Sequence, residues 1–214
     1  MVNQKKPYVI ALEEHYWDKE LAAKWGPGEG AGPPIIRDKL FDMYDTRIKE
    51  MDSAGIDMQV LSHGAPSTQR FDAETGPALA KATNDRLAEV CKAHPTRFAG
   101  FAALPTANPK AAADELERAV TKLGFKGAMI HGLSHGQKFL DLPEFWPIYE
   151  RAQALDVPLY MHPAVPHPAF IDAYLRITLR IFRASPTPPG ASPSKPRPKA
   201  CGSCSRVCST NIRS

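Results

Sequence analysis

Ionisable side chains stand at the ends of four short apolar segments in the first 163 residues. These segments are YVIALEEH, DMQVLSH, FKGAMIHG and VPLYMHP. They end at or near His15, His63, His131 and His162, respectively. In parallel α/β folds the reactive groups project from the C-terminal ends of strands, whereas a histidine used only for packing has no reason to prefer them. One such histidine would indicate a solvated loop or a core hydrogen bond. Four of them together indicate a functional site.

The first segment adds two carboxylates, Glu13 and Glu14, beside His15. Because side chains alternate along a strand, Glu13 and His15 are expected on one side and Glu14 on the other. With His162 from another strand, Glu13 and His15 would supply the three ligands that a catalytic divalent metal uses when it keeps an open position. The residues alone also allow a second interpretation, in which Glu13 pairs with a basic residue and His162 only caps a strand.

The segments that position these groups alternate in type along the chain. FAGFAALP and the four apolar segments predict five parallel strands, each nearly continuous in hydrophobicity, as in strands covered on both faces. Helical spacing separates them, with one predicted face formed by Leu40, Tyr44, Ile48 and Met51. Gly55 and Gly124 are expected as C-caps, and Asn108 with Pro109 as a helix start. The fold class is therefore α/β, either a closed (β/α) barrel or an open doubly wound sheet, and no glycine-rich phosphate loop supports a dinucleotide fold.

Composition excludes several classes of protein. The chain has 214 residues, of which 43% are hydrophobic, so it can bury a core. It contains no run of about 18 apolar residues and no signal-peptide pattern, so we expect no membrane partner and a cytoplasmic location. The formal net charge is +4, but residues 176–214 hold eight basic and no acidic residues, which leaves −4 for the first 175. The globular part is acidic, so no nucleic-acid partner is expected.

The last part of the chain differs in composition from the rest. Residues 184–214 hold six prolines, many serines and no acid, so residues 181–214 are predicted to form a disordered tail. Cys201, Cys204 and Cys208 contain one C-x2-C pair, but a structural zinc site needs a second pair of ligands, and we interpret the cysteines as accidental. An abrupt change to Pro, Arg, Ser, Ala and Cys is the composition that a shifted reading frame in a GC-rich gene would produce.

The motifs ALEEH, KGAMIHG and DVPLYMHPAVP resemble those of the amidohydrolase-related metal-dependent decarboxylases, over roughly residues 7–178. The resemblance implies a (β/α)8 TIM barrel and a divalent metal, zinc or manganese, without an organic cofactor. It also implies a small aromatic acid as substrate and a homo-oligomer in full-length relatives. Glu-x-His in place of the His-x-His of hydrolytic relatives points to the decarboxylase branch. The implied metal ligands are Glu13, His15 and His162, and the implied substrate-binding residues are His131, Tyr16 and Trp17.

The sequence departs from that family after its fifth β/α unit. The family places a catalytic histidine after a sixth strand and a metal-binding aspartate after an eighth, and no counterpart of either is identified here. His131 stands where some relatives carry asparagine. We therefore expect a partial barrel over residues 1–180, with metal-dependent decarboxylation of a hydroxyaromatic or related unsaturated acid, a carboxy-lyase activity, impaired in this chain. The alternatives are a metal-dependent hydrolase of a lactone or amide, and an inactive fragment that associates through its open edge.

Overall fold

The computed structural model describes residues 6–26, 30, 33–134, 137–163 and 166–175. The predicted tail over residues 181–214, its cysteines and the domain boundary at residue 180 lie outside these residues. Every strand pairing is parallel, and the order within the two three-stranded sheets is β1-β2-β3 and β4-β5-β6. The strands are β1 (Ile10–Tyr16), β2 (Met58–His63), β3 (Phe98–Gly100), β4 (Ala102–Ala103), β5 (Ala128–His131) and β6 (Leu159–His162).

The five predicted strand segments are confirmed, and the third is divided into β3 and β4 at Phe101. The Phe101 N–H donates to the Leu61 carbonyl at 2.9 Å, and the Ala102 N–H donates to the Gly127 carbonyl at 2.9 Å. The chain therefore changes its hydrogen-bonding neighbour from the β2 side to the β5 side within one residue. The division marks this change of neighbour, and the parallel segments keep their consecutive order.

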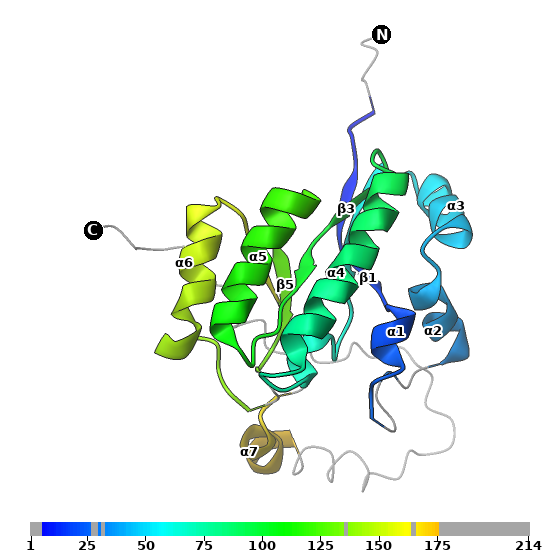
Figure 1. Cartoon of the computed structure of the whole chain (residues 1–214). Coiled ribbons are helices and arrows are strands. Elements are labelled where there is room, and N and C mark those ends of the chain that lie inside the picture. The colour runs from blue at the N-terminus through cyan, green and yellow to red at the C-terminus, as the bar shows by residue number, and fades with distance from the viewer. Residues whose placement is uncertain (1–5, 27–29, 31–32, 135–136, 164–165, 176–214) are drawn as a thin grey trace, which may run out of the picture. The chain divides into compact units, whose positions relative to one another are not determined.

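Helices connect the strands, and Figure 1 shows α4 and α5 lying across the strands with α6 beside α5. The α-helices are α1 (Lys19–Ala22), α2 (Pro34–Phe41), α3 (Asp45–Ala54), α4 (Gly76–Ala93), α5 (Pro109–Leu123), α6 (Trp146–Ala154) and α7 (Pro168–Phe170). Shorter turns are η1 (Thr68–Arg70), η2 (Pro143–Phe145) and the π-helical η3 (Ile171–Leu175). None of the helices in these ranges combines the length and apolar composition needed to span a bilayer.

The predicted helix ends are confirmed. Gly55 and Gly124 end α3 and α5 in the left-handed conformation, with φ of 72° and 75°. Glycine adopts this conformation without the steric cost that a Cβ would add. The Asn108 side chain accepts a hydrogen bond from the Ala111 N–H, and Pro109 occupies the first turn of α5.

The predicted single helical face from Leu40 to Met51 is wrong in its first half. The chain leaves the helix after Phe41 and enters α3 at Asp45. The Asp42 carboxylate accepts hydrogen bonds from the N–H groups of Tyr44 and Thr46 at 2.9 and 3.0 Å. An aspartate that binds the backbone two and four residues ahead competes with helix continuation. Consequently Met51 is buried, whereas Tyr44 is exposed.

Apolar side chains cover both faces of the strands. Leu61 and Ile130 belong to the larger core cluster, which includes residues of α4, α5 and α6. Their strand neighbours Val60 and Met129 form a smaller cluster with Phe101. Successive strand residues point to opposite faces, so these two clusters lie on the two faces of the strands. This arrangement explains the unbroken hydrophobicity of the strand sequences.

Candidate metal centre

The four histidines identified in the sequence lie at the C-terminal ends of strands, as predicted. Strand pairing places His15 opposite Ser62 and His131 directly opposite His162. His63 is the last residue of β2. Parallel strands end at the same edge of a sheet, so β1 with β2 and β5 with β6 each carry their histidines at one edge. The His15–His162 and His131–His63 contacts bring these two edges together.

Glu13 reaches this edge through an irregular backbone. The β1–β2 register shifts between Ala11 and Glu14, and Glu13 has a φ of 60°. A non-glycine residue in the left-handed region is uncommon and strained. The regular alternation assumed from the sequence is therefore wrong at this residue. The bulge nevertheless places Glu13 Oε1 3.5 Å from His162 Nε2.

His15 and His162 face each other through their Nε2 atoms, which are 3.2 Å apart. The Nδ1 of His162 lies 2.5 Å from the Pro163 carbonyl, which can only accept, so this Nδ1 carries the hydrogen and Nε2 has a lone pair. The Nδ1 of His15 lies 3.0 Å from the Ser62 hydroxyl. That hydroxyl can accept from Nδ1, which leaves Nε2 of His15 available to a metal. Burial, together with His162, lowers the pKa of His15 and favours its neutral form.

Two pairs of donor atoms, His15 Nε2 with His162 Nε2 and Glu13 Oε1 with His162 Nε2, are separated by distances that suit ligands of one ion. Two ligands bonded to one ion at about 2.0–2.2 Å, with angles of about 90–110°, lie about 2.8–3.6 Å apart. The separations of 3.2 and 3.5 Å fall in this range. Within the described ranges no three His, Cys, Asp or Glu side chains stand in metal-binding geometry. The Glu13 side chain is 45% exposed, so it has room to adjust, and the convergence of the three residues on one ion stays a prediction.

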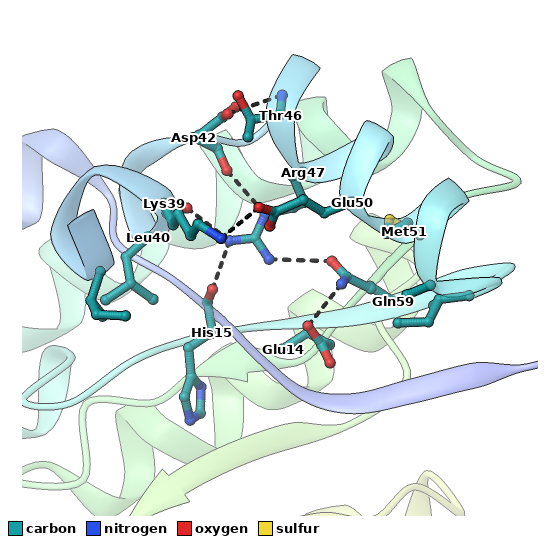
Figure 2. A pocket seen from close by; sticks show the side chains of 13 residues that line it. Glu14, His15, Lys39, Leu40, Asp42, Thr46, Arg47, Glu50, Met51 and Gln59 are labelled. Carbon is teal, nitrogen blue, oxygen red and sulfur yellow. Dashed lines mark hydrogen bonds and ion pairs between the residues drawn. The ribbon is translucent and has the colours of Figure 1, made fainter.

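Glu14 lies on the other side of β1, as predicted. Its side chain lines a cavity of about 430 Å³ between β1, α2 and α3. Figure 2 shows the ring of His15 pointing away from the other side chains that line this cavity. The Gln59 amide donates to Glu14 Oε2 at 2.8 Å. Burial raises the pKa of Glu14, and the nearby Arg47 opposes that rise. Glu14 is therefore separated from the histidine cluster.

Arg47 connects that cavity to the strand that carries the candidate ligands. Its guanidinium donates to the His15 carbonyl at 2.8 Å and to Gln59 Oε1 at 3.2 Å. These bonds hold the end of β1 against α3, and Figure 2 shows them on the helix side of the strand. The sequence did not single out Arg47 because its partners lie 12 and 32 residues away.

His63 uses both ring nitrogens within the protein. Its Nε2 accepts from the Asp18 N–H at 3.0 Å, so its Nδ1 carries the hydrogen and donates to the Gly64 carbonyl at 2.8 Å. Asp18 in turn accepts two hydrogen bonds from Arg86 at 2.7 Å. No lone pair of His63 remains for a metal, and its role is structural.

Burial of His63 predicts acid-sensitive stability. Burial lowers its pKa to about 4, whereas a histidine in the unfolded chain titrates near 6.5. Between these values the unfolded chain binds more protons, so the free energy of unfolding falls as pH drops from about 6.5 toward 4. Between pH 7 and pH 5 the free energy of unfolding should therefore fall by about 2 kcal/mol less in His63→Gln than in the parent chain. Urea denaturation at both pH values measures this, and an unchanged difference would contradict it.

The three predicted substrate-binding residues have different surroundings. His131 is 5% exposed, and its ring centroid lies 4.9 Å from that of His162. Trp17 packs against Trp25 and Phe41. Tyr16 is 3% exposed within the larger core cluster, against the ring of His63. We therefore leave Tyr16 out of the candidate centre, because the core surrounds it.

Two further residues were missed in the sequence. Ser62 is fully buried beside His15, and Gln69 accepts from the His131 N–H at 2.6 Å. Ser62 could have been found from the sequence, because it is a polar residue inside an apolar strand segment and stands next to a histidine. Gln69 offered none, because its bond to His131 spans 62 residues.

Comparison with known proteins gives matches in sequence and structure. The amidohydrolase family model Amidohydro_2 matches residues 13–192. A gamma-resorcylate decarboxylase of Polaromonas sp. is 42% identical over 172 residues, covering 77% of this chain and 53% of the relative. The chain thus spans about half the length of the curated relatives it matches.

Solved structures agree with this match. A dihydroxybenzoic acid decarboxylase from Polaromonas sp. JS666, with bound manganese and 2-nitroresorcinol, has a TM-score of 0.71 at 39% identity, covering 80% of this chain and 54% of the other. A 5-carboxyvanillate decarboxylase from Novosphingobium aromaticivorans, complexed with manganese and 4-hydroxy-3-methoxy-5-nitrobenzoic acid, has a TM-score of 0.72 at 31% identity, with 80% and 55% coverage. The α/β fold therefore matches that of metal-dependent decarboxylases.

Proposed function

Because this chain belongs to the amidohydrolase family, we propose that it carries the metal-binding part of a non-oxidative decarboxylase of small hydroxylated aromatic acids. The observation that carries the proposal is the approach of Glu13, His15 and His162 at the strand ends, with donor-atom separations of 3.2 and 3.5 Å. The named relatives support the reaction class. We also propose that residues 7–178 form the first five β/α units of a (β/α)8 barrel.

Glu13, His15 and His162 would hold one divalent metal. Two imidazoles and a carboxylate suit zinc or manganese, and the manganese in the related structures makes that metal the first to test. When bound, the metal would supply positive charge that offsets the carboxylate of an aromatic acid and helps to orient that carboxylate and the adjacent hydroxyl. No organic cofactor is part of the proposal.

The surrounding residues prepare these ligands. The Pro163 carbonyl fixes the tautomer of His162, and the Ser62 hydroxyl can do the same for His15. Such outer hydrogen bonds orient metal-binding imidazoles and raise their basicity. Trp17 is assigned to the wall of the substrate site, since its indole ring and the Cβ of His15 both lie beside Gly64. The acid that protonates the ring carbon is not assigned to any described residue.

For the complete protein we propose two further properties, its oligomeric state and its location. By analogy with the family we propose a homo-oligomer in the cytoplasm. The hydrolysis of a lactone or amide stays a prediction without support from the named relatives. Decarboxylation releases carbon dioxide and hydrolysis does not, so one assay separates the two.

The test is a chimera that joins residues 7–178 to the corresponding second half of the Polaromonas sp. gamma-resorcylate decarboxylase. With manganese added, we expect carbon dioxide release from dihydroxybenzoate, loss of that release with a chelator, and recovery when manganese is restored. The control is the same incubation with a lactone and an amide. Hydrolysis of either compound without carbon dioxide release from dihydroxybenzoate would contradict the proposed function.

A further inference from the structure

His131 has an unused lone pair inside the protein. Its Nε2 lies 2.7 Å from the His63 carbonyl, and a carbonyl only accepts, so Nε2 carries the hydrogen. The Nδ1 atom of the neutral ring is then an acceptor. This atom is buried and has no hydrogen-bond partner among the described residues.

An unpaired buried acceptor calls for an explanation. Leaving such a group without a partner costs about 1–3 kcal/mol, and most buried polar side-chain atoms have a partner. Two hydrogen bonds position His131. Its backbone N–H donates to the side chain of Gln69, and its ring Nε2 donates to the His63 carbonyl. The ring is therefore held in one orientation with one nitrogen left over.

The three neighbouring histidine rings lie close enough to surround one ion after side-chain movement. The ring centroids are 4.8 Å apart for His15 and His162, 4.9 Å for His131 and His162, and 5.6 Å for His15 and His131. An imidazole bonded at about 2.1 Å has its ring centre about 3.2 Å from the metal, so angles of about 90–120° give centroid separations of about 4.5–5.5 Å. The two separations from His162 fall in this range, and the 5.6 Å between His15 and His131 lies just above its upper end.

We propose that His131 Nδ1 is a fourth protein ligand of the metal held by Glu13, His15 and His162. This inference rests on the proposed metal centre and replaces the substrate contact predicted for His131. All three histidines share an arrangement common to metal-binding imidazoles, in which one ring nitrogen is bonded to a hydroxyl or carbonyl and the other keeps a lone pair available to a metal. His63 lacks this arrangement because both of its nitrogens have partners.

The first experiment counts imidazoles on the metal in the full 214-residue chain. The chain is loaded with one equivalent of Zn²⁺, and X-ray absorption at the zinc edge resolves the number of coordinated histidines. We expect three in the parent chain and two in His131→Asn. The control is His94→Asn, which removes a histidine that packs against Tyr44 and Phe98, and which should retain three.

The second experiment measures zinc affinity by competition with a chromophoric chelator. Losing an outer partner of a ligand already costs about 10–100-fold in affinity, so we expect His131→Asn to lose at least about 100-fold. His94→Asn should match the parent chain. Circular dichroism verifies that each variant is folded, and the imidazole count of the parent chain does not depend on any variant folding.

The outcomes separate this inference from the proposed centre. Three imidazoles in the parent chain, with weaker binding by His131→Asn, support the inference. Two imidazoles, with unchanged binding by His131→Asn and weaker binding by His15→Asn, overturn the inference and leave the three-ligand centre standing. Unchanged binding by both His15→Asn and His162→Asn overturns the centre itself and the inference with it.

Discussion

Glutamine in place of Glu13 is expected to lower the decarboxylation rate of the chimera by at least about 100-fold. The substitution keeps the size of the side chain but removes the negative charge that stabilises a divalent cation. The loss of an outer partner alone costs about 10–100-fold in metal affinity or activity, so a direct ligand should cost at least the upper value. Glu13 Oε1 lies 3.5 Å from His162 Nε2, which places the carboxylate within reach of the same ion.

Glu14→Gln is the matched control for Glu13→Gln. It makes the same chemical change at the next residue, but on the side of β1 that faces α2 and α3. Its carboxylate is bonded to Gln59 and lies near Arg47, away from the candidate ligands, so we expect kcat/KM to stay close to that of the parent. Bound manganese and kcat/KM are measured for both variants. Equal losses in the two variants would show that Glu13 has no special role.

The 214-residue chain by itself is expected to bind metal but to release carbon dioxide at least about 10²–10⁴-fold more slowly than the chimera. Positioned general acid catalysis typically contributes this factor, and none of the described residues is assigned as the acid. The resemblance places a catalytic histidine and a metal-binding aspartate after later strands, and the match covers only about half of the relatives' length. Water entering an incomplete site would also weaken the electrostatic interactions there.

Single-turnover assays with equal metal loading measure this difference. The chain and the chimera are each given one equivalent of manganese, and carbon dioxide is followed over hours. Release by the 214-residue chain at the rate of the chimera, abolished by a chelator and by Glu13→Gln, would be incompatible with the prediction. Metal binding without release would support the hypothesis that this chain holds the centre but does not complete it.

Local sequence patterns were enough to predict the elements of the fold. Strand segments were found from short apolar runs, and the ends of α3 and α5 from Gly55, Gly124 and Asn108. These features depend on residues within one or two turns of each other, so they can be recognised along the chain before the tertiary contacts are known. The break at Asp42 was missed, because its capping bonds compete with an apolar face that suggested a continuous helix.

By itself, the sequence determined which chemical groups stand at the strand ends, because hydrophobic runs and their polar ends follow each other along the chain. Only the tertiary structure decided how these groups meet. The bulge that turns Glu13 toward His162 arises from the pairing of β1 with β2. The nitrogen of His131 that is left without a partner depends on the bond of the other nitrogen to a carbonyl 68 residues away. The position of His15 depends on hydrogen bonds with Ser62 and Arg47. Each of these contacts joins segments distant in sequence, so their geometry exists only after the strands and helices have packed.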